Sequence, residues 1–201
     1  MSKKSSSKEK EEGQYRSDNR RQELMVAAAH LFNQRGYDAT SMRDIAREAG
    51  MLAGSMYYHF PSKDDLIIAT YEEGKRLISG ALIAAVEDVE DPWERLSLAA
   101  IAHMNTLFGD NNFSILLCAD ISRTSPSLRN RLVEIRDSYD ALFMDLIENL
   151  PLPPETDRGL LRLSLLGSLN WSSSWYRPGG QSPAQIGEFF VSIVKNGLAG
   201  K

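Results

Sequence analysis

The sequence predicts an all-α protein of nine helices, and three observations support this prediction. From residue 18 onward, apolar residues recur three or four positions apart, which is the spacing of one face of an α-helix. No stretch alternates between apolar and polar residues with the period of two that a half-buried strand requires. Capping residues, glycines and prolines separate the periodic segments, as expected for successive helices joined by short connections.

The first three helices are short and the following six are mostly longer. In chain order, the predicted helices cover residues 20–35, 41–50, 54–60, 63–86, 91–107, 112–123, 125–150, 155–176 and a last segment from 182 onward. Gly36 and Gly50 are placed to end the first two helices in the left-handed conformation. The residues expected to cap helix N-termini, by accepting hydrogen bonds from backbone amides, are Asp18 or Asn19, Ser41 with Asp44, Ser62 with Asp65, Asp91, Ser125, and Ser182 with Gln185.

Composition excludes several classes of protein. The chain has 201 residues and a mass of 22.5 kDa, with 42% apolar and 25% charged residues, which is ordinary for a globular protein able to bury a core. The single cysteine, Cys118, cannot form an intrachain disulfide or a cysteine zinc site. The longest apolar run, residues 77–86, is far shorter than the roughly 20 residues of a membrane span. We therefore expect a cytoplasmic protein that does not associate with membranes.

Charge is distributed unevenly along the chain. Residues 1–63 contain 11 Lys or Arg and 8 Asp or Glu, whereas residues 64–201 contain 12 and 19. A basic head on an acidic body indicates two functions, because only the head would be attracted to phosphate. An ordinary solvated surface is the alternative explanation. We predict a disordered basic arm over 1–17, a DNA-binding domain over 18–63, and a ligand-binding and dimerisation domain over 64–201.

Residues 41–60 have the pattern of a helix-turn-helix unit, with two short helices separated by a turn at Gly50. Apolar residues, Ile45 and Ala46 in the first helix and Met56 and Phe60 in the second, supply the inner faces. The outward positions of the second helix are small, hydroxylated or aromatic, as a helix that enters the DNA major groove requires. An ordinary helical hairpin within a bundle is the alternative, and the exposed tyrosines argue against it.

The segment ATSMRDIAREAGMLAGSMYYHFPSKDDLI, residues 39–67, resembles the DNA-binding signature of the TetR family of bacterial transcriptional regulators. A second segment, NWSSSWYRPGGQSP at 170–183, is similar to a TetR subgroup that includes regulators of fatty-acid, steroid-ring and other acyl-CoA catabolism. The resemblance implies a nine-helix TetR-like fold and a homodimer that binds a palindromic DNA operator. It also implies a repressor that a small-molecule effector releases from DNA.

The resemblance assigns roles to individual residues of the first domain. Arg43 would contact a base or a phosphate, Tyr57 would contact DNA from the second helix of the motif, and His59 and Lys63 would hold phosphates. The predicted DNA-binding residues are Thr40, Ser41, Arg43, Ala53, Gly54, Ser55, Tyr57, Tyr58, His59 and Lys63. Few of these carry side-chain donors near the beginning of the second helix, so DNA shape would contribute to specificity.

The body of the protein is predicted to hold the effector site and the dimer interface. The last two helices are apolar on more than one face, which indicates either a four-helix bundle with a second subunit or complete burial in one chain. The two tryptophans of helix 155–176 would line the ligand pocket or pack in the dimer core. The predicted ligand-binding residues are His103, Leu107, Phe113, Tyr139, Phe143, Trp171 and Trp175, with Arg123 or Arg177 near the entrance.

Three classes of function remain after these observations. The leading hypothesis is a repressor whose effector is an acyl-CoA or another large hydrophobic acid. A DNA-binding protein without an effector, which acts through protein partners, is the second. An all-helical enzyme is the third, and it is disfavoured because the sequence has no recognisable catalytic cysteine context, metal-ligand spacing or phosphate-binding glycine loop. We expect no cofactor and no bound metal.

Overall fold

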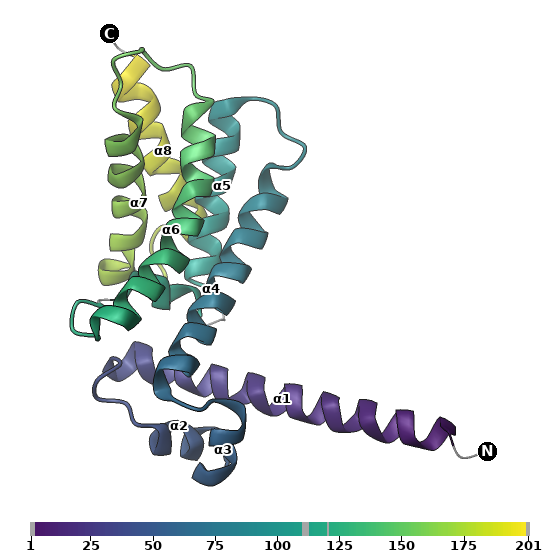
Figure 1. The fold of residues 1–201 in the computed structure, drawn as a ribbon. Coiled ribbons are helices and arrows are strands. Elements are labelled where there is room, and N and C mark those ends of the chain that lie inside the picture. Colours follow the sequence, from purple (N-terminus) through teal and green to yellow (C-terminus); the bar gives the residue numbers. More distant parts are fainter. Residues whose placement is uncertain (1–2, 110–112, 120, 200–201) are drawn as a thin grey trace. The chain divides into compact units, whose positions relative to one another are not determined.

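The computed structural model describes the backbone of residues 3–109, 113–119 and 121–199, and the side chains of 18–109, 113–119 and 121–197. These residues form eight α-helices and one 3₁₀ helix and contain no strand, which confirms the all-α prediction (Figure 1). The elements are α1 (Lys3–Arg35), α2 (Met42–Glu48), α3 (Ala53–His59), α4 (Lys63–Val86), α5 (Pro92–Leu107), η1 (Ser114–Cys118), α6 (Pro126–Glu148), α7 (Arg158–Trp175) and α8 (Pro183–Ala199). None of the helices described is both long and apolar enough to cross a membrane.

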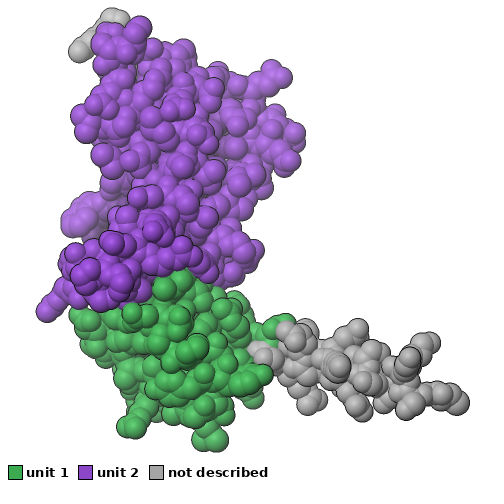
Figure 2. All heavy atoms as spheres, viewed as in Figure 1, with its two compact units in different colours: residues 1–70 green, residues 71–201 purple. Residues whose placement is uncertain are grey.

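The chain forms two compact units, residues 1–70 and residues 71–201 (Figure 2). The division falls within α4, between Thr70 and Tyr71, whereas the predicted domain boundary lies at the beginning of this helix. Unit 1 thus includes the first eight residues of α4, Lys63 to Thr70, because this part of the helix supplies core residues to the unit. Leu66 and Ile67 of α4 are buried in the core of unit 1.

Unit 1 is held together by apolar side chains from four helices. Its fully buried members include Leu24 and Ala28 of α1, Ile45 of α2, Met56 of α3 and Leu66 of α4. Gly36 has φ +79°, a left-handed conformation that ends α1 without the strain a Cβ would cause. The apolar face of α1 therefore explains why this helix packs in the core, and Gly36 explains why it ends where the sequence predicts.

The beginning of α1 differs from the sequence prediction. The helix begins at Lys3, whereas the sequence predicts a disordered arm over 1–17 and a helix from Arg20. The segment has lysine and glutamate residues that favour a helix and no proline that would end one. The expected cap at Asp18 or Asn19 therefore lies inside the helix.

Unit 2 contains the rest of α4 together with α5, η1, α6, α7 and α8. Helix α5 packs along α8, and α7 packs against both α6 and α8. A Cβ at Gly187 of α8 would lie 2.8 Å from the carbonyl oxygen of Ala100 in α5. The absence of a side chain at Gly187 thus allows these two helices to approach closely.

The predicted sixth helix, 112–123, is wrong as an α-helix. Its described part is the five-residue 3₁₀ helix η1, and positions 112 and 120 lie outside the described residues. The segment is buried at Phe113, Ser114, Leu116 and Leu117, so other parts of unit 2 surround it. A segment of this length is also too short to nucleate an α-helix on its own. The following helices match the prediction more closely, although α7 begins at Arg158, where Asp157 caps it, rather than at Glu155.

Candidate DNA interface and effector site

Helices α2 and α3 form the predicted helix-turn-helix unit. Gly50, with φ +63°, lies in the turn between them, and the amide of Met51 donates to the carbonyl of Ala46 at 2.8 Å. Ile45 and Ala46 of α2 and Met56 of α3 are buried, as predicted. The opposite surface of both helices is exposed.

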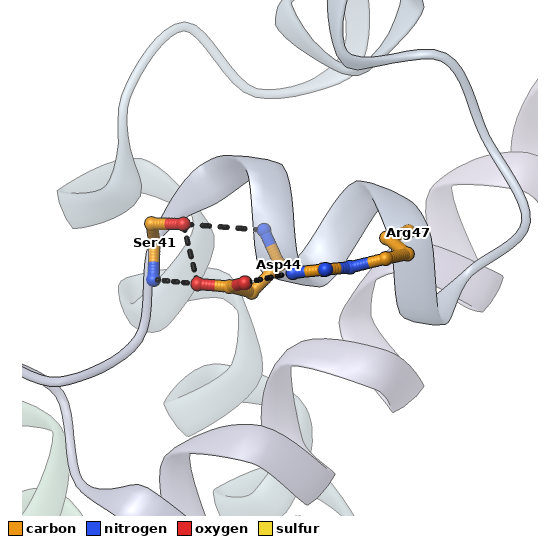
Figure 3. A network of polar contacts seen from close by, with 3 residues as sticks. All are labelled: Ser41, Asp44 and Arg47. Carbon is orange, nitrogen blue, oxygen red and sulfur yellow. Dashed lines mark hydrogen bonds and ion pairs between the residues drawn. The ribbon is translucent and has the colours of Figure 1, made fainter.

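A network of polar contacts fixes the beginning of α2 (Figure 3). The Ser41 hydroxyl accepts from the Asp44 amide at 3.2 Å, and the Asp44 carboxylate accepts from the Ser41 amide at 3.2 Å and the Ser41 hydroxyl at 2.5 Å. Arg47, one turn further along, donates to the same carboxylate. Hydrogen bonds from Ser41, with a smaller contribution from Arg47, lower the pKa of Asp44. This capping box confirms the predicted roles of Ser41 and Asp44 in starting the helix.

Most of the predicted DNA-binding residues lie on the surface of unit 1. Arg43, Ser41, Gly54 and Ser55 are exposed, and Ala53 is half-buried. Tyr57 is 52% exposed and Tyr58 is 84% exposed. The rings of Tyr58 and the half-buried His59 meet edge to face, with centroids 5.4 Å apart. The surface formed by α2 and α3 thus presents two arginines, Arg43 and Arg47, together with two phenols and several small residues.

Thr40 and Lys63, two predicted phosphate contacts, make polar interactions within unit 1. Thr40 is buried, and its hydroxyl donates to the carbonyl of Gly36 at 2.8 Å. The Lys63 ammonium donates to the carbonyls of Tyr37 and Thr40 at 2.9 and 3.0 Å. It also lies 4.0 Å from the centroid of the Tyr37 ring, while the Tyr37 hydroxyl donates to Asp64. These contacts join the beginning of α4 to the loop between α1 and α2.

The predicted effector residues fall into two groups, and five of the seven are buried in unit 2. His103, Tyr139 and Phe143 are in mutual contact, with His103 Nδ1 2.7 Å from the Tyr139 hydroxyl and the His103 and Phe143 ring centroids 5.9 Å apart. Leu107 and Phe113 are also buried. Residues from α5, from α6 and from the N-cap of η1 therefore contribute to a common core.

Further polar side chains lie near this group. The Cys118 thiol donates to the side-chain oxygen of Asn170 at 3.3 Å, and Asn170 approaches the His103 ring. Cys118 is also within electrostatic range of the hydroxyls of Tyr71 and Tyr139. Among the residues that the structure describes, neither the buried Tyr71 hydroxyl nor His103 Nε2 has a hydrogen-bond partner of good geometry. An unpaired buried hydroxyl is unusual, because its desolvation is not compensated.

The buried polar group of unit 2 consists of Tyr71, His103, Cys118, Tyr139 and Asn170, and burial keeps its four ionisable members uncharged. Desolvation lowers the pKa of His103 to about 4, against a smaller opposing effect of Asn170. Desolvation likewise raises the pKa of Cys118 to about 12 and the pKa values of both tyrosines above their usual range. At neutral pH the group therefore offers hydrogen bonds without a net charge.

Trp171 and Trp175 lie outside this buried group. They are 70% and 45% exposed on α7, in a row that continues through Leu160 and Leu163. Helix α8 has exposed apolar residues too, Phe189 at 59% and Ile193 at 52%. A cavity of about 540 Å³, lined by Trp175, Gln181, Gln185, Ile186, Phe189 and Phe190, opens on the same two helices.

The remaining candidates of the body are distributed over the surface. Arg123 and Arg177 are both exposed, and Arg177 donates to the carbonyl of Tyr176 at 2.8 Å. Tyr37, Tyr71 and Cys118 were not among the predicted site residues. Their sequence signals are weak, because a single tyrosine on a helical face looks like ordinary core and only the fold reveals which hydroxyl lacks a partner.

The fold and the exposed α2–α3 surface define a helix-turn-helix DNA-binding protein, and comparison with known proteins supplies the family. Residues 24–70 match the model of bacterial regulatory proteins of the tetR family, and residues 89–198 match that of the tetracyclin repressor-like C-terminal domain. The chain belongs to the tetR family of transcriptional regulators. The predicted class of function, a DNA-binding transcriptional repressor, is confirmed by this membership and by relatives that are transcriptional repressors.

Two curated relatives illustrate the similarity. The HTH-type transcriptional repressor KstR2 of Mycobacterium tuberculosis is 31% identical over 191 residues, which cover 90% of this chain and 94% of the relative. The fatty acid metabolism regulator protein of Bacillus subtilis is 23% identical over 152 residues, 74% of this chain and 78% of the relative.

Solved structures show the same fold. The ketosteroid transcriptional regulator KstR2 of M. tuberculosis superposes with a TM-score of 0.73 at 28% identity, covering 89% of this chain and 94% of that one. AibR, solved with isovaleryl coenzyme A and operator DNA, has a TM-score of 0.77 at 23% identity, covering 87% and 97%. FadR of B. subtilis, solved with stearoyl-CoA, has a TM-score of 0.74 at 19% identity, covering 88% and 98%.

Proposed function

We propose that this regulator acts in the cytoplasm as a homodimeric repressor that a CoA thioester of a hydrophobic acid releases from a palindromic operator. The observation that carries the proposal is the buried polar group of unit 2, which contains an unpaired hydroxyl within an apolar core. Relatives of the same family that were solved with isovaleryl coenzyme A or stearoyl-CoA support the choice of ligand class. Regulation of transcription, rather than catalysis, is therefore the proposed role.

The proposed DNA contacts are the exposed members of the predicted set. Arg43 and the Tyr57–His59 segment supply charge, hydroxyls and aromatic rings to the DNA, and Ser41 supplies a hydroxyl. Thr40 and Lys63 are left out of this set, because their polar atoms bind carbonyl oxygens of unit 1. A palindromic operator follows from the two-fold symmetry of a dimer.

The exposed apolar faces of α7 and α8 support dimerisation. Leu160, Leu163 and Trp171 recur at helical spacing on α7, and Phe189 and Ile193 lie one turn apart on α8. Large exposed apolar surfaces of this kind mark protein interfaces. A Leu163→Glu substitution should shift sedimentation from dimer to monomer and abolish tight operator binding, whereas the exposed Ile83→Glu on α4 serves as the matched control. A dimer that survives Leu163→Glu and a second substitution, Phe189→Glu, would contradict this assignment.

The effector is tested by measuring operator release. A fluorescently labelled operator, selected from random-sequence DNA by the full-length protein, is titrated with CoA, acyl-CoA thioesters of increasing size and the corresponding free acids. A thioester should raise the apparent dissociation constant of the operator; a tenfold rise requires about 1.4 kcal/mol of preference for the DNA-free conformation. Operator binding that no compound in the panel changes would favour the effector-independent regulator.

A matched pair of variants tests the buried polar group. Tyr71→Phe removes the unpaired hydroxyl, so it should leave thermal stability unchanged or slightly higher while it weakens the response to the effector. Tyr176→Phe is the control, because the Tyr176 ring packs against Phe108 with centroids 4.2 Å apart, outside the buried polar group. This variant should respond to the effector like the wild type. Equal responses of both variants would remove Tyr71 from the effector site.

A further inference from the structure

Helix α3 begins with an exposed apolar side chain. Leu52 occupies the N-cap position, with φ −72° and ψ 136°, and its side chain makes no capping hydrogen bond. Leu52 is 80% exposed and is the most exposed of the large aliphatic side chains among the described residues. In contrast, the N-cap of α2 is Ser41, whose hydroxyl accepts from the backbone of the helix.

Neither folding nor packing accounts for leucine at this position. Serine, threonine, aspartate and asparagine are preferred at N-caps because they accept a hydrogen bond from a free amide, and leucine is among the least favourable residues there. An aliphatic side chain that remains 80% exposed contributes almost nothing to the core. An unfavourable N-cap residue on the surface proposed to face DNA therefore indicates that Leu52 has a role in binding.

The residues beside Leu52 restrict what it can contact. Ala53 and Gly54 carry no hydrogen-bonding side chain, and Ser55 carries only a short hydroxyl. The beginning of α3 therefore presents an apolar surface to the major groove. The apolar group that base pairs expose in this groove is the C5-methyl group of thymine.

We propose that Leu52 determines part of the operator specificity by packing against the C5-methyl group of a thymine in each half-site. The inference rests on the proposed DNA-binding role of α3 and adds a specificity-determining residue to it. Arg43 would bind through its charge, whereas the rings of Tyr57 and Tyr58 could also touch a methyl group, so substitution of Leu52 is needed to identify the residue that makes the contact.

The test replaces thymine by deoxyuridine, which lacks only the methyl group, one symmetric pair at a time in the selected operator. In the wild-type dimer, replacing one symmetric pair of contacted thymines removes two methyl groups. The operator affinity should fall about fourfold for each methyl group removed. The Leu52→Ser variant should bind the thymine operator more weakly than the wild type and should be insensitive to deoxyuridine at that pair. The conservative Leu52→Met variant should retain sensitivity to the methyl group.

Thermal stability separates this role from a structural one. Leu52→Ser restores a favourable N-cap, so its melting temperature should equal or exceed that of the wild type while its operator affinity falls. A structural role would move stability and affinity in the same direction.

Two outcomes would overturn the proposal. Wild-type binding that is unaffected by deoxyuridine at every thymine excludes a methyl contact, while leaving DNA binding itself established. Equal deoxyuridine sensitivity of the wild type and Leu52→Ser assigns the contact to another residue. Failure of the wild type to select any DNA sequence would refute the proposed function together with this inference.

Discussion

At the scale of single residues, exposure separates side chains available to DNA from those that hold unit 1 together. Tyr57 and Lys63 illustrate the difference, because the sequence motif assigns both to DNA. Tyr57 is 52% exposed, whereas the Lys63 ammonium donates to two backbone carbonyls. The two residues should consequently respond differently to truncation.

Tyr57→Ala should weaken operator binding by about 1 to 3 kcal/mol without changing thermal stability, because about half of this residue is exposed to solvent. Gel shifts at two salt concentrations, together with a melting curve, measure both effects. Wild-type affinity in this variant, with normal helical content, would remove Tyr57 from the DNA interface.

Lys63→Ala should lower the free energy of unfolding by about 1 kcal/mol, because the carbonyls of Tyr37 and Thr40 lose a charged donor. Desolvation already lowers the pKa of this lysine, which agrees with its partly buried position. Chemical denaturation of the variant measures the loss. An unchanged unfolding midpoint with a salt dependence of DNA binding reduced by about one unit of slope would instead identify Lys63 as a phosphate contact.

At the scale of helices, local chemistry determines where most elements begin and end. Ser41, Asp91 and Ser125 each accept a hydrogen bond from a backbone amide of the helix that follows, as their sequence positions predict. These features are predictable because the interacting groups are only three residues apart. Segment 112–123 is not predictable in this way, because its 3₁₀ geometry depends on burial against distant parts of unit 2, where the carbonyl of Phe113 meets Gly74.

Ser41→Ala should destabilise unit 1 by about 1 kcal/mol, because the first turn of α2 loses its hydroxyl acceptor. Asp44 accepts hydrogen bonds from Ser41, so the two residues are coupled. Asp44→Ala should therefore lower the free energy of unfolding less in the Ser41→Ala variant than in the wild type. A double-mutant cycle based on urea denaturation checks this coupling. Strictly additive losses would show that the capping box contributes no cooperative stability.

At the scale of the whole molecule, the sequence predicts which helices are apolar but not which apolar faces remain exposed. The sequence pattern places Trp171 and Trp175 on one side of α7, which is equally compatible with a ligand pocket and with a dimer interface. Their exposure follows from the packing of α5, α6 and α8, which involves residues far apart in the chain. The buried position of His103, by contrast, was predictable because it lies within the apolar stripe of α5.

Stability should fall in mild acid because of His103. Its pKa is about 4 in the folded protein and 6.5 as an unperturbed group, so the unfolded chain binds more protons between these values. The stabilisation is complete above pH 6.5 and is lost as the pH falls toward 4, by up to about 3 kcal/mol. The difference in melting temperature between pH 7 and pH 4.5 should be smaller in His103→Gln than in the wild type. Equal differences would exclude His103 as a source of acid sensitivity.

Deleting residues 1–17 should leave the fold and the dimer intact, because the segment has few apolar residues and the apolar core of α1 is supplied by Leu24, Ala28 and their neighbours. The deleted segment contains four lysines and Arg16, so non-specific attraction to DNA should weaken and depend less on salt. Circular dichroism melting and sedimentation check the first expectation, and gel shifts check the second. A large loss of thermal stability would show that this segment is structural.

The uncharged state of the buried polar group in unit 2 has a consequence for signalling. His103, Cys118, Tyr71 and Tyr139 keep fixed protonation states near neutrality, because their pKa values lie far from pH 7. An effector that exchanges hydrogen bonds with them neither takes up nor releases protons there. For the proposed effector, titration of these four side chains should therefore not alter binding near neutral pH.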